Sequence, residues 1–112
     1  MIGARPRRLC GGEEASSLRF LEKLSEVIER RHTERPEGSY TAKLFEGGIK
    51  RISQKFGEEA VEVVIAAQSD DPTELARECA DVLFSLMVLL RARSLTLEDV
   101  VRELEARHGP DE

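Results

Sequence analysis

The sequence predicts an all-α fold, a bundle of four to five helices with a central antiparallel helix hairpin. Apolar residues recur at helical spacing along most of the chain, and no run alternates between apolar and polar residues as a β-strand would. The composition agrees, since 40% of the 112 residues are hydrophobic, 35% are charged and only four are prolines. A chain of this length has room for one domain with a modest core.

The N-terminal part is expected to hold a tail followed by the first helix. Residues 1–15 contain Gly, Pro and Arg without periodicity, which predicts a disordered N-terminal tail. A single all-α domain is expected over residues 16–109. Ser16 or Ser17 is the expected N-cap of a helix that runs to about His32, because apolar residues recur at helical spacing after it.

Two helices are expected in the middle of the chain. Residues 36–39 form a break, and Ser39 can cap a short helix over residues 40–45. A long helix over residues 49–68 follows a pair of glycines. Its core stripe is expected to consist of Ile52, Phe56, Val63 and Ala67.

The second half of the hairpin and the last helix carry clear start signals. Asp71 is a candidate N-cap, and Pro72 suits the first helical position of a helix that runs to about residue 94. Thr96 and Asp99 form a pair that resembles a capping box at the start of the final helix. The residues of this helix expected to face inward are Val100, Val101 and Leu104.

Five acids at helical spacing stand out on the two helices of the predicted hairpin. Glu58, Glu59 and Glu62 lie on the first helix, and Glu78 and Asp81 lie on the second. In an antiparallel pair, Glu62 comes level with Glu78, and Glu59 comes level with Asp81. The register therefore predicts that two carboxylates from each helix face each other.

These four facing carboxylates indicate a metal site. Across helix axes about 8–10 Å apart they would repel one another, and a hard divalent cation removes that repulsion. Mg²⁺ prefers oxygen ligands and keeps several waters, which leaves positions open for phosphate. The competing interpretation is that the acids are the solvated faces of two amphipathic helices.

Three cations, Lys50, Arg51 and Lys55, precede the acids by one or two helical turns. On one interpretation they are ordinary partners for acids four residues away, as Lys55 is for Glu59. On the other, they place positive charge beside a metal, where a polyphosphate would lie. The spacing favours neither interpretation.

The overall charge and the cysteines limit the partners and the compartment. A formal net charge of −5 argues against a nucleic-acid duplex as the main partner. The two cysteines make no disulfide framework, which fits a reducing compartment. No apolar core of about 7–15 residues follows the basic N-terminus, so no signal peptide is expected and the predicted location is the cytoplasm.

The longest apolar run, residues 82–90, is interrupted by one serine and is far too short to span a membrane. It is apolar on most sides, and a small domain has few elements with which to cover it. We therefore expect one side of this run to face the chain's own core and the other a partner subunit, which predicts a homodimer.

Several stretches carry a family resemblance. The pattern Glu-Glu-x-x-Glu, fifteen residues, Glu-x-x-Asp resembles the metal-binding signature of the all-α, MazG-like nucleoside triphosphate pyrophosphatases. Within that superfamily, the chain resembles the phosphoribosyl-ATP pyrophosphatase family over about residues 18–108. The specific stretches are SYTAKL at residues 39–44, QKFGEEAVE at 54–62 and LLRARSL at 89–95. The chain departs from the family's common residues at Cys79, Phe84, Ser85 and Ser94, none of which replaces a carboxylate.

The resemblance implies Mg²⁺-dependent hydrolysis of phosphoribosyl-ATP to phosphoribosyl-AMP and pyrophosphate by a helical homodimer, the second step of histidine biosynthesis. The implied metal ligands are Glu59, Glu62, Glu78 and Asp81, the same four acids that the register brings together. Glu58, one position off that stripe, would orient the attacking water as a base or support the metal ligands, and an ordinary surface role is the equal alternative. The residues expected to contact the substrate are Tyr40, Lys43, Arg51 and Lys55.

Two other functions are compatible with the sequence. A house-cleaning pyrophosphatase would use the same metal site on a free or modified nucleoside triphosphate, although residues 40–43 argue against it. A non-catalytic helical module would dimerise through residues 82–90 and carry its acids only as surface charge. Mg²⁺ binding coupled to phosphate separates this module from either enzyme.

Overall fold

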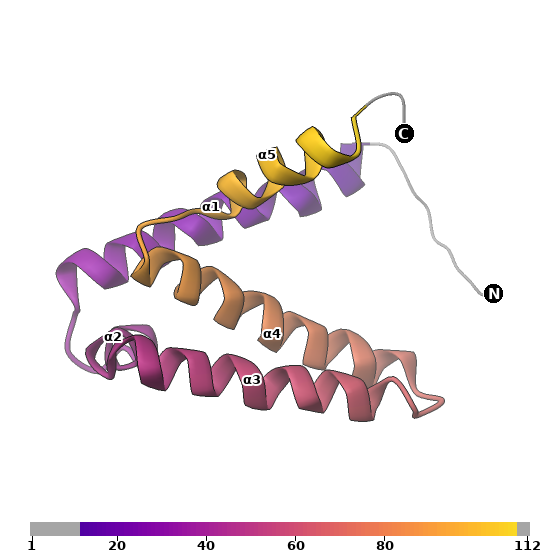
Figure 1. Ribbon diagram of the computed structural model, residues 1–112, viewed down its shortest axis with the longest axis horizontal. Helices are drawn as coiled ribbons and strands as arrows, with labels where there is room; N and C mark the ends of the chain where they lie inside the picture. The colour runs from indigo at the N-terminus through magenta and orange to yellow at the C-terminus, as the bar shows by residue number, and fades with distance from the viewer. Residues whose placement is uncertain (1–11, 110–112) are drawn as a thin grey trace.

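The computed structural model describes residues 12–109, and within that range every regular element is a helix. This confirms the predicted all-α fold. The helices are α1 (Gly12–Glu34), α2 (Tyr40–Glu46), α3 (Gly48–Ala66), α4 (Pro72–Ala92) and α5 (Leu97–Arg107). Figure 1 shows α3 and α4 side by side and antiparallel, joined by a short turn at one end, with α2 near the opposite end of the pair. The predicted central hairpin is therefore present.

Helix α1 begins earlier than the sequence predicts. Residues 12–15 were assigned to the N-terminal tail, whereas the structure has them in α1, which starts at Gly12. The prediction relied on apolar periodicity, and residues 13–15 contain two Glu and one Ala, which favour helix without any apolar repeat. The rest of the predicted tail, residues 1–11, lies outside the described residues.

The starts of α2 and α4 have the predicted caps. The Ala42 amide donates a hydrogen bond to Ser39 Oγ at 3.1 Å, and the Thr73 amide donates one to Asp71 Oδ1 at 2.9 Å. Each of these bonds satisfies a backbone N–H that the first turn of a helix leaves without an intrahelical partner. Pro72 occupies the first turn of α4, where its missing N–H does no harm.

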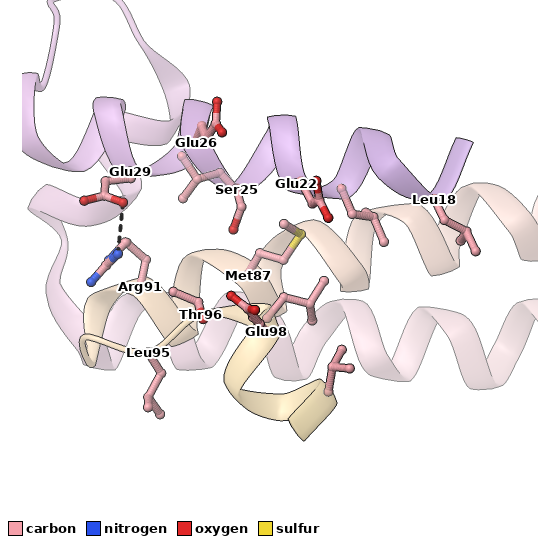
Figure 2. Close-up of a pocket in the computed structure, with 14 residues that line it drawn as sticks. Leu18, Glu22, Ser25, Glu26, Glu29, Met87, Arg91, Leu95, Thr96 and Glu98 are labelled. Carbon is pink, nitrogen blue, oxygen red and sulfur yellow. Dashed lines mark ion pairs between the residues drawn. The ribbon is translucent and has the colours of Figure 1, made fainter. Parts of the chain in front are cut away.

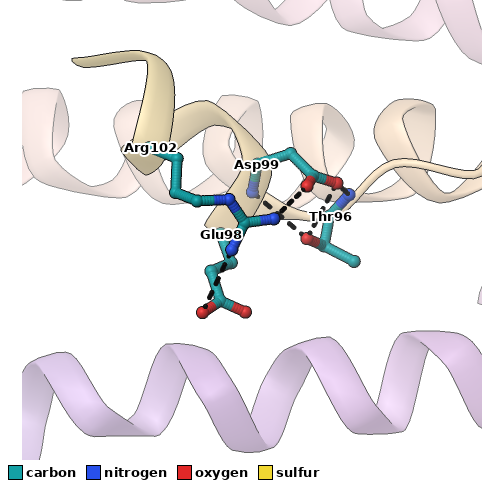
Figure 3. A network of polar contacts seen from close by, with 4 residues as sticks. All are labelled: Thr96, Glu98, Asp99 and Arg102. Carbon is teal, nitrogen blue, oxygen red and sulfur yellow. Dashed lines mark hydrogen bonds and ion pairs between the residues drawn. The ribbon is translucent and has the colours of Figure 1, made fainter. Parts of the chain in front are cut away.

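A polar network at the start of α5 contains the predicted capping box (Figure 3). The Thr96 amide donates to Asp99 Oδ2 at 2.8 Å, and the Asp99 amide donates to Thr96 Oγ1 at 3.2 Å. Arg102 pairs with Asp99 and with Glu98. The hydrogen bond from the Thr96 backbone, followed by that from its hydroxyl, lowers the pKa of Asp99 below its ordinary value.

Replacing Thr96 with alanine is expected to loosen α5. A lost N-cap costs about 1 kcal/mol, and α5 has no buried residue to offset that loss. The helix should therefore open locally more often, and its amide hydrogens should exchange about fivefold faster, the factor that 1 kcal/mol gives at 25 °C. Native-state hydrogen exchange measures this, with the amides of α4 as an internal reference and the Thr33→Ala variant as a control, because Thr33 is an exposed threonine on α1. Unchanged exchange in α5 would contradict the capping role.

The hydrophobic core lies where α1, α2, α3 and α4 meet. Its buried residues are Ile28, Leu44, Phe45, Ile52, Met87 and Val88. On α3 the predicted stripe is correct for Ile52, whereas Phe56 and Val63 are only half-buried. Ala67 is exposed and its neighbour Ala66 is buried instead, because α3 ends at Ala66 and the chain then turns toward α4.

One prediction about the apolar surfaces is wrong. Val101 and Leu104 of α5 were expected to face inward but are 44% and 49% exposed, because α5 makes little contact with the other helices. Residues 82–90 are all buried or half-buried within the chain, and the expectation that one side of them faces a partner stays a prediction. The most exposed apolar side chains of the hairpin belong to α3: Val61, Val64 and Ile65. None of the helices described is long and apolar enough to cross a membrane.

His32, near the end of α1, is expected to make the free energy of unfolding depend on pH. Its ring meets the Phe45 ring edge-on, with centroids 4.5 Å apart. Partial burial, followed by the positive charges of Arg35 and Arg91, lowers the pKa of His32 below 6.5. The unfolded chain therefore takes up this proton at a higher pH than the folded chain does.

Stability is accordingly expected to fall as the pH drops through about 6.5, and to level off below the folded pKa of His32. Urea unfolding at pH 7.5 and at pH 5.5 measures the difference. The same pair of measurements on a His32→Gln variant is the control, because this variant lacks the titrating ring. An equal loss of stability in both proteins would assign the effect to other groups.

Candidate functional site

The polar centre of the hairpin is a contact between α3 and α4. Ser85 of α4 is 3% exposed, and its hydroxyl donates a hydrogen bond to Glu59 Oε1 of α3. The side chain of Glu59 is itself only 16% exposed. Glu59, one of the predicted metal ligands, therefore points into the seam between the two helices.

The contact agrees with the predicted register. Side chains lean toward the N-terminus of their own helix, so in an antiparallel pair Glu59 and Ser85 lean toward each other. A hydrogen bond between them is what we expect when Glu59 lies near the level of Asp81, one turn before Ser85 on α4. This geometry supports the predicted pairing of the acids.

A cation and a phenol adjoin Glu59. The Lys55 ammonium lies 3.5 Å from Glu59 Oε2, one turn earlier on α3. The Tyr40 side chain at the start of α2, followed by the Glu59 carboxylate, raises the pKa of Lys55 above its ordinary value, which shows that both groups lie close to the ammonium. Tyr40, Lys55 and Glu59, predicted from the sequence as site residues, therefore form one cluster with Ser85, drawn from three helices.

The other predicted metal ligands lie toward the turn of the hairpin. Glu62 follows Glu59 by one turn, while Glu78 and Asp81 precede Ser85 by about two turns and one turn. Glu62 and Asp81 are exposed, and Glu78 is half-buried. Among the side chains that the structure describes, no three of His, Cys, Asp or Glu already stand close enough together to hold a metal ion. The structure thus brings together Glu59 and its neighbours but does not gather all four acids.

The remaining predicted residues lie at the surface near this cluster. Glu58 is exposed, and Gln54 Nε2 donates a hydrogen bond to its Oε2 at 3.1 Å. Lys43 is exposed on α2, one turn after Tyr40. Arg51 is exposed on α3, and its aliphatic carbons pack so close to Gly47 that a Cβ there would lie 2.9 Å from Cγ of Arg51.

Ser85 belongs to the cluster around Glu59 but was not predicted as a site residue. From the sequence, Ser85 stood out only as a departure from the common residues of the family. Its spacing was a usable signal, because Ser85 follows Asp81 by four residues and so falls on the same helical face.

A cavity with a volume of about 690 Å³ lies elsewhere, between α1, α4 and α5 (Figure 2). Its walls combine apolar side chains such as Leu21 and Met87 with several glutamates, and an ion pair of 3.3 Å joins Arg91 to Glu29. None of the predicted catalytic, substrate or metal residues lines it. The candidate site is therefore the open seam of the hairpin.

Comparison with known proteins supports the resemblance seen in the sequence. The family model described as phosphoribosyl-ATP pyrophosphohydrolase matches residues 21–108. The chain is similar to proteins called "Histidine biosynthesis bifunctional protein HisIE" in several bacteria. It is 46% identical to the protein of Bacteroides thetaiotaomicron over 89% of this chain and 50% of that protein. It is 55% identical to the protein of Xanthomonas campestris over 80% of this chain and 43% of that protein. It is 48% identical to the protein of Bacillus subtilis over 87% of this chain and 47% of that protein.

The chain spans about half the length of these curated relatives. The family match itself extends from the middle of α1 into the residues just after α5 and includes every residue of the cluster around Glu59. It therefore covers most of the helical domain that the structure describes, and on this ground the chain belongs to the phosphoribosyl-ATP pyrophosphohydrolase family.

Proposed function

We propose that this chain hydrolyses phosphoribosyl-ATP to phosphoribosyl-AMP and pyrophosphate, the second step of histidine biosynthesis. The observation that carries the proposal is the cluster of Tyr40, Lys55, Glu59 and Ser85, which joins a phenol, a cation and a carboxylate at the hairpin seam. The family match supports the substrate. The reaction would take place in the cytoplasm, with no part for nucleic acid or membrane.

Mg²⁺ is the proposed cofactor, and the donors on the hairpin suit it chemically. Glu59, Glu62, Glu78 and Asp81 are all carboxylates, the hard oxygen ligands that Mg²⁺ prefers. The Lys55 ammonium pairs with Oε2 of Glu59, so its single positive charge does not neutralise the four carboxylates. When bound, Mg²⁺ would polarise phosphoryl oxygens and lower the pKa of an attacking water.

The chain's own residues have separate tasks in this proposal. Lys55 would neutralise negative charge on the triphosphate, helped by Lys43 and Arg51, whose exposed side chains are free to reach a ligand in solvent. Tyr40 would donate a hydrogen bond from its phenolic hydroxyl to a substrate oxygen. Glu58 would accept the proton of the attacking water, because its exposed carboxylate lies beside the metal-binding stripe.

A homodimer is also proposed, and the exposed apolar residues suggest its surface. Val61, Val64 and Ile65 lie on α3 with 57%, 63% and 56% of their surface exposed. Three such residues on adjacent turns form an apolar strip that a second copy of the hairpin would cover. These α3 residues expose more of their apolar surface than residues 82–90, the first expected interface, do.

The test is release of pyrophosphate by the purified protein in the presence of Mg²⁺. Phosphoribosyl-ATP, ATP, dUTP and the other common triphosphates are compared at equal concentration. We expect release from phosphoribosyl-ATP alone and its loss when EDTA is added. Release from a free triphosphate instead would indicate a house-cleaning pyrophosphatase, and release from none of them would favour a non-catalytic helical module.

A further inference from the structure

Ser85 occupies an unusual position for a helical serine. Among the residues whose burial the structure describes, Ser85 is the one polar residue that is buried, with 3% of its surface exposed. A buried hydroxyl needs a hydrogen-bond partner, and inside a helix this is commonly the carbonyl four residues earlier. The Ser85 hydroxyl instead crosses from α4 to α3 and donates to Glu59. The contact is therefore a link between helices.

The two oxygens of Glu59 have different partners. Oε1 accepts the hydrogen bond from Ser85, while Oε2 lies 3.5 Å from the Lys55 ammonium. With one partner on the opposite helix and one on its own, the carboxylate is held from two directions. Each carboxylate oxygen carries two lone pairs, so both contacts leave acceptor sites open. Glu59 is thus oriented while it keeps the capacity to bind a cation.

We propose that Ser85 is a positioning residue for the metal site. Its hydroxyl holds the Glu59 carboxylate in the orientation that binds the divalent cation, and it thereby raises the affinity of the site for Mg²⁺. The inference rests on the proposed function, because it requires Glu59 to be a metal ligand. Partners that orient ligating groups typically contribute about 10- to 100-fold in metal affinity or activity.

The two exposed acids make this orientation important. Glu62 and Asp81 are solvent-exposed, so their side chains must be ordered when a cation binds. Glu59 is the one acid of the four that the structure already holds in place, through Ser85 and Lys55. Because Glu59 is already held in place, less conformational entropy is lost when the cation binds. Removing Ser85 would free the Glu59 side chain and increase that entropic cost.

The test compares Ser85→Ala with wild type by titration calorimetry with Mg²⁺ alone, and by the Mg²⁺ concentration that gives half-maximal pyrophosphate release. We expect both to shift about tenfold toward weaker binding in Ser85→Ala. Ser85→Thr, which retains the hydroxyl, should stay near wild type. Ser53→Ala is the matched control, because Ser53 is exposed on α3. If Ser85→Ala does not fold, Ser85→Cys provides a variant of similar size with a weaker donor.

A double-mutant cycle tests whether Ser85 acts through Glu59. In a Glu59→Gln background, adding Ser85→Ala should weaken Mg²⁺ binding no further, whereas independent roles would give additive losses. Wild-type Mg²⁺ affinity in Ser85→Ala, with only a lower Tm, would overturn the inference and leave the proposed function standing. A wild-type protein that binds Mg²⁺ but does not hydrolyse phosphoribosyl-ATP would instead contradict the proposed function.

Discussion

Glu62→Ala is expected to lower kcat for phosphoribosyl-ATP by roughly 100-fold or more while the fold stays intact. A metal ligand acts on charge that develops in the transition state, and losing about 3 kcal/mol of that stabilisation corresponds to about two factors of ten in rate. Glu62 is exposed, so its removal leaves no cavity. Alanine also has a higher helix propensity than glutamate, and the change removes one negative charge from the acidic stripe. Without metal, the variant should therefore be as stable as wild type or slightly more stable.

The measurement is steady-state hydrolysis at saturating Mg²⁺, together with thermal unfolding in the presence of EDTA. Glu105→Ala is the matched control, because Glu105 is an exposed glutamate on α5, far along the chain from the acids of the hairpin. It should have wild-type turnover. Near-normal turnover in Glu62→Ala would remove Glu62 from the metal site and favour the interpretation of the acids as a solvated helix face.

Ile52→Ala is expected to lower the free energy of unfolding by about 3 kcal/mol, within the range of about 2–5 kcal/mol for truncating a buried isoleucine. Ile52 is 1% exposed and belongs to the core cluster of α1, α2, α3 and α4. The loss combines the transfer energy of the deleted methyl and methylene groups with the cavity that they leave. In a protein of this size such a loss is a large fraction of the total stability.

Chemical denaturation with urea measures the change. The same substitution at Ile49, one turn earlier on α3 and 40% exposed, is the matched control and should cost less than about 1 kcal/mol. Similar losses at the two positions would show that burial of Ile52 does not dominate the stability of the hairpin. Loss of activity that follows only the loss of folded protein would confirm that Ile52 has no part in the chemistry.

Much of the candidate site could be predicted because its signals are local. Glu59 and Lys55 are four residues apart on one helix, so helical periodicity alone brings them together, and the observed ion pair agrees. The link to Ser85 could not be assigned in this way. It depends on how α3 and α4 are rotated about their own axes when they pack. The same pattern of apolar residues is compatible with many such rotations. The approach of Tyr40 to Lys55 likewise depends on how α2 folds back at the end of the hairpin.

The sequence by itself determined where most of the helices begin and that two of them form an antiparallel pair. Caps at Ser39, Asp71 and Thr96 are side-chain contacts to amides two or three residues away, so residue type and spacing are sufficient to predict them. Only the tertiary structure decided which apolar faces are covered. Residues 82–90 are buried or half-buried while Val61, Val64 and Ile65 remain exposed, because burial depends on which helices pack together, and periodicity leaves that choice open.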